Sequence, residues 1–213
     1  MPQHGKVSMS VVRRMPRYLR FLSELPADGV LRISSQELAE KMGVTASQIR
    51  QDLNCFGGFG QQGYGYNVQA LCYEISKILY VEASRPAIII GAGRMGTAVY
   101  THLDFSTRGF CVAGVFDNSP EVIGKIMKDQ KVRPIADLDK FCEEKKPVMA
   151  VLCIPKDAAK SLAPELIKNG ITAFWNFSHY DISLDYPDCI AENVHMGDSL
   201  MTLSYRLNSS DFE

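Results

Sequence analysis

Hydrophobic positions follow two different periodicities along this 213-residue chain. Over residues 11–56, apolar residues recur every three to four positions, which is the spacing of one helix face. From Ala87 onward, short apolar runs alternate with helical patterns, which predicts βαβ units on a parallel sheet. Arg85-Pro86 separates the two patterns, because the residue before a proline is disfavoured in a helix. We therefore predict two unlike domains.

Two short helices with clear start signals are predicted in the first domain. Ser34 and Glu37 have the spacing of a capping box, in which each side chain bonds the other's backbone N–H. Gly43 is expected to end this first helix, because glycine tolerates the left-handed conformation. Residues 45–48 begin the second helix with a similar cap. The polar face of this second helix would carry Ser47, Gln48, Arg50, Gln51 and Asn54.

Such a pair of helices joined by a glycine-containing turn is typical of a helix-turn-helix. Its second helix would meet DNA bases with its N-terminal half, where Arg suits guanine and Gln or Asn suits adenine. An ordinary helical hairpin with a polar surface is the alternative. The following segment, residues 56–66, alternates glycine with aromatic residues and glutamine. This composition indicates a short hairpin, or wing, rather than a flexible linker, which favours Gly and Ser.

A dinucleotide-binding fingerprint opens the second domain. The predicted strand Ala87–Ile90 is followed by G-x-G-x-x-G over residues 91–96 and then by a helical pattern over 97–103. In this setting the first glycine permits the tight turn, the second admits the pyrophosphate and the third allows close packing. The phosphates would lie at the helix N-terminus, where free N–H groups attract anions.

Further chemistry lies at the ends of later strands. A strand over residues 110–116 ends at Asp117, 21 residues after Gly96, where a carboxylate accepts hydrogen bonds from ribose hydroxyls. Its charge would repel a 2′-phosphate, so we predict NAD(H) over NADP(H); a simple turn cap is the alternative. Strands over 148–154 and 171–175 are also predicted. Because ligands bind at the carboxyl ends of such strands, the candidates for a nicotinamide pocket are Ile154, Pro155, Asn176 and Phe177.

Charge and cysteine usage narrow the class of protein. The net charge is −1, but residues 1–56 carry eight basic and five acidic side chains, so this segment is +3 and the remainder is −4. A basic end on an acidic body suits contact with phosphates. The six cysteines are scattered without a C-x-x-C pair, which favours buried thiols over a zinc site or disulfides. We expect no metal, no membrane span and a cytoplasmic location.

Several motifs together resemble those of one family, the Rex proteins. They occur at residues 14–20, 47–53, 56–66, 91–96 with Asp117, 175–177, and 192–194 with 203–205. The resemblance covers nearly the whole chain, and the occurrence of these motifs in order is highly specific. Rex proteins are bacterial redox-sensing transcriptional repressors.

The resemblance implies a homodimer that binds palindromic double-stranded operator DNA through its winged helices. NAD+ and NADH would compete for the Rossmann domain, and NADH would favour a closed dimer that cannot hold both half-sites. The C-terminal helix, here about residues 196–208, would be exchanged between subunits. Independently of the family, Leu200, Leu203 and Leu207 have an i, i+3, i+7 spacing that suits burial against a partner. An ordinary docked terminal helix is the alternative.

The fold class is therefore α/β, with a winged helix-turn-helix followed by a Rossmann doubly wound parallel sheet and a swapped C-terminal helix. We predict boundaries at residues 1–85 for the DNA-binding domain with its linker helix, 86–194 for the Rossmann domain and 195–213 for the helix and tail. The predicted cofactor-binding residues are Gly91, Ala92, Gly93, Arg94, Met95, Gly96, Asp117, Ile154, Pro155, Asn176 and Phe177. The predicted DNA-binding residues are Arg14, Ser47, Gln48, Arg50, Gln51 and Tyr64.

Two positions depart from the family's switch. Many Rex proteins couple a tyrosine and an aspartate to an arginine of the DNA-binding domain, which corresponds to Arg20. Here the matching positions are His102 and His195, and Asp198 lies one turn beyond. A carboxylate–arginine pair between Arg20 and position 195 is therefore ruled out, and a pair between Arg20 and Asp198 is the alternative. Because histidine titrates near neutrality, we hypothesise that release by NADH depends on pH.

The sequence admits two other functions. A small NAD-dependent oxidoreductase would need a general acid or base above the nicotinamide, and His179 is the only histidine suitably placed in the sequence. About 130 residues leave little room for a substrate domain, so we assign no catalytic residue and expect no enzyme. The other alternative is a constitutive DNA-binding protein whose Rossmann domain serves only for dimerisation. Cofactor binding separates it from a redox repressor.

Overall fold

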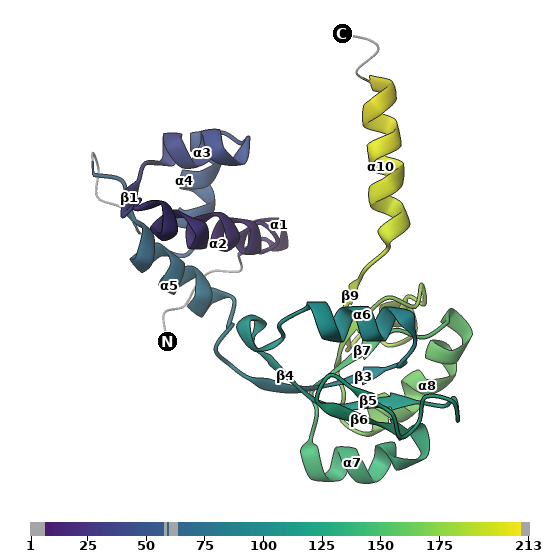
Figure 1. Cartoon of the computed structure of the whole chain (residues 1–213). Helices are drawn as coiled ribbons and strands as arrows, with labels where there is room; N and C mark the ends of the chain where they lie inside the picture. The colour runs from purple at the N-terminus through teal and green to yellow at the C-terminus, as the bar shows by residue number, and fades with distance from the viewer. Residues whose placement is uncertain (1–6, 58, 60–63, 210–213) are drawn as a thin grey trace. The chain divides into compact units, whose positions relative to one another are not determined.

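The computed structural model describes residues 7–57, 59 and 64–209. It divides into two compact units, Met1–Glu82 and Ala83–Glu213, and each unit is described by itself. Figure 1 shows the chain coloured from the N-terminus to the C-terminus. Across the described ranges, no helix combines the length and apolar character needed to cross a bilayer.

The first unit is mainly helical. Its elements in chain order are α1 (Met9–Val12), α2 (Met15–Glu24), η1 (Leu25–Asp28), β1 (Arg32–Ile33), α3 (Ser35–Met42), α4 (Ala46–Asn54), β2 (Tyr66–Asn67) and α5 (Val68–Ile78). Helices α2 and α5 pack together, as do α3 and α4. The core between these helices includes Met15, Leu22, Leu38, Ile49, Leu71 and Ile75. The unit thus has its own hydrophobic core, as an independently folded domain requires.

The two predicted helix starts have different outcomes. The capping box of α3 is confirmed: Ser34 and Glu37 exchange side-chain and backbone hydrogen bonds of 3.1 and 2.7 Å. Gly43 ends this helix in the left-handed conformation, also as predicted. At α4 the Thr45 side chain accepts a hydrogen bond from the Gln48 N–H, but the Gln48 side chain contacts Asp52 instead of returning to Thr45. Only half of the second box therefore forms.

The segment predicted as a wing, residues 56–66, ends in a small two-stranded sheet. Strands β1 and β2 pair antiparallel, with Ile33 opposite Tyr66. Gly65 has φ +68°, and a Cβ at this position would lie 2.7 Å from the Ile33 carbonyl oxygen, so glycine allows the strands to approach. Residues 58 and 60–63, which form the predicted tip, lie outside the described residues.

The second unit is built on a seven-stranded sheet. Its strands are β3 (Arg85–Ile90), β4 (Phe110–Asp117), β5 (Ile126–Met127), β6 (Gln130–Pro134), β7 (Met149–Leu152), β8 (Ala173–Asn176) and β9 (Ile190–Asn193). They lie in the order β5-β6-β4-β3-β7-β8-β9. All neighbouring pairs are parallel except β5 with β6. Without β5, this order is that of a doubly wound dinucleotide-binding fold, and the predicted fold class is confirmed.

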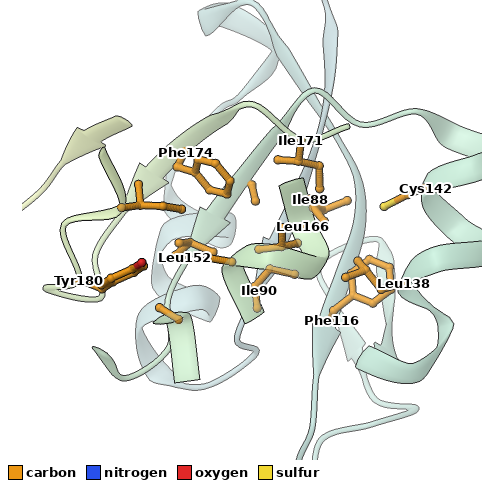
Figure 2. Close-up of a cluster of buried hydrophobic side chains, with 14 of the residues drawn as sticks. Ile88, Ile90, Phe116, Leu138, Cys142, Leu152, Leu166, Ile171, Phe174 and Tyr180 are labelled. Carbon is orange, nitrogen blue, oxygen red and sulfur yellow. The ribbon is translucent and has the colours of Figure 1, made fainter. Parts of the chain in front are cut away.

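Helices cover both faces of this sheet. They are α6 (Arg94–His102), η2 (Ser106–Arg108), η3 (Ile135–Asp137), α7 (Leu138–Lys145), α8 (Lys156–Lys168) and α9 (Ile182–Asp185). Alternate residues of β3 serve opposite faces: Ile88 and Ile90 pack with α7 and α8, whereas Ala87 and Ile89 pack with α6. Figure 2 shows the first of these clusters, in which Phe116, Leu138 and Leu166 surround the strand residues.

The chain ends in the helix α10 (Met196–Ser209), which agrees with the predicted range of 196–208. Its apolar side chains are exposed, including Leu200 at 67% and Leu203 at 51%. A helix that exposes a row of large apolar residues is unusual on a stable monomer. The exchange of this helix between subunits stays a prediction.

Candidate dinucleotide and DNA-binding sites

The glycine-rich loop between β3 and α6 is held so closely that two of its positions require glycine. Gly91 has φ +100°, and a Cβ there would lie 2.6 Å from the Cys153 carbonyl oxygen. A Cβ on Gly96 would lie 1.9 Å from the Gly91 carbonyl oxygen. Both obstacles are backbone atoms, which cannot move aside as a flexible side chain does. The loop and the start of α6 therefore form one tightly packed turn.

The middle of this loop is open. Gly93 and Arg94 are exposed, and a Cβ built on Gly93 meets no heavy atom within 4 Å. Gly93 is the N-cap of α6, where the structure places no side-chain cap on the first turn. Met95 is half-buried, and Ala92 is buried. An uncapped helix N-terminus behind an open loop is suited to receive a phosphate group, because its N–H groups and dipole favour anions.

Asp117, at the end of β4, is bonded to both the loop and its own turn. Its Oδ2 accepts a 2.6 Å hydrogen bond from the Ala92 N–H, and its Oδ1 accepts one of 2.8 Å from the Ser119 N–H. The predicted alternative, a turn-capping aspartate, is therefore present in the geometry. Each carboxylate oxygen still has a further lone pair. The same side chain is thus able to hold the turn and to accept bonds from a ribose.

A cavity of about 450 Å³ lies at the carboxyl ends of β3, β4 and β7. Of the predicted residues, it is lined by Gly91, Asp117, Ile154 and Pro155. Its other lining residues, not foreseen from the sequence, are Ile90, Asn118, Ile135, Ala158, Ser161 and Leu162. The small residues Ala158 and Ser161, which follow Pro155 in the sequence of α8, are the signal that could have indicated this wall.

Two predicted pocket residues lie outside that lining. The Asn176 side chain is buried; its amide group donates to the Tyr180 carbonyl oxygen at 2.6 Å and to Asn193 Oδ1 at 2.8 Å. Its own Oδ1 accepts from the N–H and hydroxyl of Ser178. Phe177 packs edge-on against Trp175, with ring centroids 4.8 Å apart. A role for Asn176 and Phe177 toward the cofactor stays a prediction.

These features fit a dinucleotide. The loop needs its first and third glycines for packing, its second glycine is open, and a carboxylate bridges the loop and the neighbouring strand. The cavity beside them is mostly apolar, as binding sites for planar rings are. In the described part of the chain, no three His, Cys, Asp or Glu side chains converge as metal ligands.

On the helix-turn-helix, the predicted DNA contacts separate into two groups. Ser47, Arg50 and Gln51 are exposed on α4, with Arg50 Nη1 donating to Ser35 Oγ at 2.9 Å. Tyr64 is 71% exposed beside β2. Arg14 and Gln48, in contrast, are half-buried and bind one shared acceptor, which is not among the predicted DNA-binding residues.

That acceptor is Asp52 on α4, which is only 1% exposed. Arg14 forms a bidentate pair with it, at 2.6 and 2.7 Å, and the Tyr18 hydroxyl donates at 2.6 Å. Gln48 Nε2 donates to Asp52 Oδ1 at 2.9 Å. Burial alone would raise the pKa of Asp52, but the hydrogen bonds from Arg14, Tyr18 and Gln48 outweigh it and lower the pKa. The signal was an acid between Ile49 and Leu53 on the apolar face of α4.

The switch candidates lie in both units. Arg20 is exposed in the first unit, and its guanidinium lies 6.0 Å from the ring centroid of Phe21. In the second unit His102 is exposed, whereas the His195 ring stacks on His179. The Asp198 N–H bonds the His195 carbonyl oxygen. Tyr100, near His102, points instead into the core and donates its hydroxyl to Asp129.

Two family models match the chain, one on each unit. The model described as a putative DNA-binding protein N-terminus matches residues 6–54. The model described as a CoA binding domain matches residues 82–180. The two matches thus cover the helix-turn-helix and most of the Rossmann sheet.

Two full-length relatives share one name. The chain is 51% identical to the redox-sensing transcriptional repressor Rex of Thermoanaerobacter pseudethanolicus, over 99% of this chain and 94% of the relative. It is 46% identical to the protein of the same name from Clostridium beijerinckii, over 99% of this chain and the whole of the relative.

Solved structures agree with these relatives. The chain is similar to RSP, solved in complex with NAD+ and operator DNA, with a TM-score of 0.89 and 50% identity over 98% of this chain and 95% of that one. It is also similar to RSP in complex with NADH, with a TM-score of 0.88 and 47% identity over 98% and 97% of the two chains.

Proposed function

The chain belongs to the Rex family of redox-sensing transcriptional repressors, and on that premise we propose that it represses transcription by binding operator DNA until NADH releases it. The first unit binds the DNA, and the second binds NAD+ or NADH. The protein thereby couples gene expression to the NADH/NAD+ ratio.

One observation carries this proposal. The two ligands that it requires, a nicotinamide dinucleotide and operator DNA, occur together in a solved structure that is 50% identical to 98% of this chain. A second structure of the same relative contains NADH. The features suited to both ligands also occur here, in the open glycine loop beside Asp117 and in the exposed polar face of α4.

The chain's own residues divide the work of binding the dinucleotide. Gly91, Gly93 and the N-terminus of α6 receive the pyrophosphate, and Asp117 accepts hydrogen bonds from the ribose. Ile154 and Pro155 supply an apolar wall. NADH and NAD+ differ by a hydride, and hence in the charge and planarity of the nicotinamide ring. An apolar wall therefore favours the neutral ring of NADH over the cation.

On the DNA side, Ser47, Gln48, Arg50 and Gln51 form the reading face of α4, with Arg14 and Tyr64 beside it. Exposed Arg50 and Gln51 suit contacts to base edges, since Arg pairs with guanine and Gln with adenine. The basic N-terminal segment supplies attraction to the phosphates, so binding weakens as salt rises.

The functional form is a homodimer on a palindromic operator. Support comes from α10, whose Leu200 and Leu203 are exposed in the single chain at the spacing of an interface stripe. Exchange of α10 between subunits would bury this row. It would also connect the dimer arrangement to His195, which immediately precedes the helix.

No catalytic step is required by this function. The oxidoreductase alternative depends on His179, which is exposed and stacks on His195. Among the described residues, His179 does not belong to the cavity lining. The protein acts where bacterial operator DNA lies, and we therefore assign it to the cytoplasm.

The test is fluorescence anisotropy of a labelled palindromic Rex-type operator at fixed salt, with NADH and then NAD+ added to the complex. We expect tight binding that NADH abolishes and NAD+ spares. Tight binding indifferent to both cofactors would overturn the redox function and leave a constitutive DNA-binding protein. Absence of DNA binding under every condition would return attention to an enzyme and to His179.

A further inference from the structure

Asp52 is a buried ionisable side chain of the first unit, and its carboxylate therefore needs hydrogen-bond donors. Its carboxylate is buried and receives four hydrogen bonds, two from Arg14, one from Tyr18 and one from Gln48. Two of the three donors, Arg14 and Gln48, are residues predicted to contact DNA. A buried charge is stable only where hydrogen-bond partners surround it. The four bonds therefore fix the positions of the carboxylate and of its three donor side chains.

The charge of Asp52 dictates the orientation of the Gln48 amide. Hydrogen bonds from its neighbours keep the pKa of Asp52 low against the effect of burial, so the carboxylate is ionised at neutral pH. An ionised carboxylate only accepts hydrogen bonds. The Gln48 atom that meets it at 2.9 Å must therefore be the nitrogen. A flip of the amide would bring two oxygens together in a buried site.

We propose that Asp52 is a specificity-determining positioning residue, which locks the Gln48 amide so that its carbonyl oxygen and second N–H read an adenine in the operator. Asp52 does not itself touch DNA. This inference rests on the proposed DNA-binding function and names the residue that makes one of its base contacts selective.

The chemistry of the free groups identifies the base. With one N–H engaged by Asp52, Gln48 retains one acceptor and one donor. In the major groove adenine presents the complementary pair, the N7 acceptor and the N6 amino donor, and glutamine binds it through two bonds. A freely rotating amide could exchange the positions of its donor and acceptor and so bind another base edge. The hydrogen bond to Asp52 prevents this rotation. Gln48 is also the third residue of α4, in the half of a recognition helix that meets bases.

The same network also fixes the orientation of Arg14. Its Nε–H and one N–H of Nη2 are engaged by Asp52, which leaves three N–H groups on the outer edge of the guanidinium for DNA. We therefore expect Asp52 to orient Arg14 as well as Gln48.

The experiment uses the full-length protein with Asp52→Asn, which keeps the shape and removes the charge. Every base pair of the operator half-site is substituted in turn, and the position whose preference disappears in Gln48→Ala is assigned to Gln48. At that position wild-type protein should prefer adenine by about 5- to 150-fold. It should lose affinity in a similar way for 7-deazaadenine, which lacks the N7 acceptor, and for purine, which lacks the 6-amino group.

In Asp52→Asn we expect this preference to fall to within about threefold, a small part of what a good bidentate contact supplies, while binding to non-specific DNA changes little. The matched control is Glu40→Gln. Glu40 accepts a 3.0 Å bond from Gln36 at the same i, i+4 spacing, but both side chains are exposed on α3. This control removes the same charge and should leave the base preference unchanged.

Thermal unfolding shows whether Asp52→Asn is folded. If it is not, a second measurement tests the proposal without an Asp52 variant. Relaxation of the side-chain ¹⁵N nuclei in the wild-type protein should give Gln48 an order parameter that approaches the ~0.85 of a rigid backbone, and the exposed Gln36 a value below ~0.6, as in flexible segments. A Gln48 amide as mobile as that of Gln36 would overturn the proposal.

The outcomes separate this inference from the proposed function. If wild-type protein binds the operator and folded Asp52→Asn keeps the same preference at the Gln48 position, the positioning role is wrong and the repressor function stands. If no operator position responds to Gln48→Ala, the base contact is wrong as well. If wild-type protein binds no operator, both the proposed function and this inference fail.

Discussion

The imidazole rings of His179 and His195 stack with their centroids 4.8 Å apart and only 13° between their planes. His179 lies in the left-handed conformation, with φ +59°, in the segment after β8. His195 directly precedes α10, and its Nδ1 is buried without a hydrogen-bond partner among the described residues. The stack therefore joins the segment after β8 to the start of α10.

We therefore predict that the NADH concentration for half-release of the operator differs between pH ~6 and ~7.5, the range in which histidine ordinarily changes charge. His195→Asn should make the response nearly independent of pH. Anisotropy titrations at constant ionic strength measure the effect. The exposed His102, the other candidate, is tested by His102→Gln, and the variant that flattens the profile identifies the group. Identical wild-type curves across this range would disprove the hypothesis.

The second prediction concerns Asp117. Asp117→Asn should relax the preference for NADH over NADPH, because it removes the charge that repels a 2′-phosphate. It should also lower the free energy of unfolding by about 1–3 kcal/mol, since hydrogen bonds from Ala92 and Ser119 to a charged acceptor are replaced. Cofactor titrations followed by the fluorescence of Trp175, the single tryptophan, measure the first effect. Thermal unfolding measures the second.

The chain contains a matched control for Asp117. Asp104 accepts a 3.0 Å bond from the Ser106 N–H two residues later, in the same kind of turn but away from the glycine loop. Asp104→Asn should leave cofactor preference unchanged. An unaltered ratio of NADH to NADPH affinity in Asp117→Asn would show that Asp117 serves the turn alone.

The third prediction contrasts two glycines of one loop. Gly96→Ala should destabilise the protein by roughly 1–3 kcal/mol or more, the cost of overpacking, because the new Cβ meets the Gly91 backbone. Gly93→Ala should leave stability nearly unchanged, since that Cβ enters open space, yet weaken dinucleotide binding by blocking the approach of the pyrophosphate. Thermal unfolding and NADH titration separate the two effects. Equal melting temperatures for the two variants would contradict the packing argument.

The fourth prediction concerns assembly through α10. Leu203→Lys places a charge in the exposed apolar row, and we expect the variant to shift from dimer to monomer in light scattering. Thr202→Lys is the control, because Thr202 lies beside this row on the helix and bonds within α10. A dimer that persists in Leu203→Lys would exclude this row as the principal interface.

Local signals in the sequence predicted much of the fold. The capping box of Ser34 and Glu37 depends on residues three apart, so its spacing was sufficient. The first strand and the glycine loop of the second unit were also predicted correctly, because close packing there allows only glycine at position 96. The short antiparallel strand β5 was not predicted, since two residues carry no periodicity. The linker helix expected at the end of the DNA-binding domain is α5, which ends at Ile78.

Contacts between distant residues were harder to predict at the candidate sites. Asp52 binds Arg14 and Tyr18, which lie 38 and 34 positions away in the sequence. No local sequence pattern predicts a buried carboxylate with four hydrogen bonds. Gln48 was predicted both to contact DNA and, from its spacing, to return a hydrogen bond to Thr45. Its amide instead donates to Asp52, because a charged carboxylate is the stronger acceptor. Likewise, the wall of the cavity formed by Ala158 and Leu162 depends on how α8 packs over the sheet.

Cys153 lies directly beneath the dinucleotide loop, where its carbonyl oxygen restricts Gly91. An oxidised sulfur at this point would disturb the loop, yet burial raises the pKa of the thiol to about 12. The thiolate, not the thiol, attacks peroxide and other electrophiles, and the raised pKa makes the thiolate scarce here at neutral pH. Cys153 therefore reacts slowly with oxidants, and the loop above it keeps its shape when peroxide is present. The dinucleotide site then responds to the supply of metabolic hydride and not to peroxide.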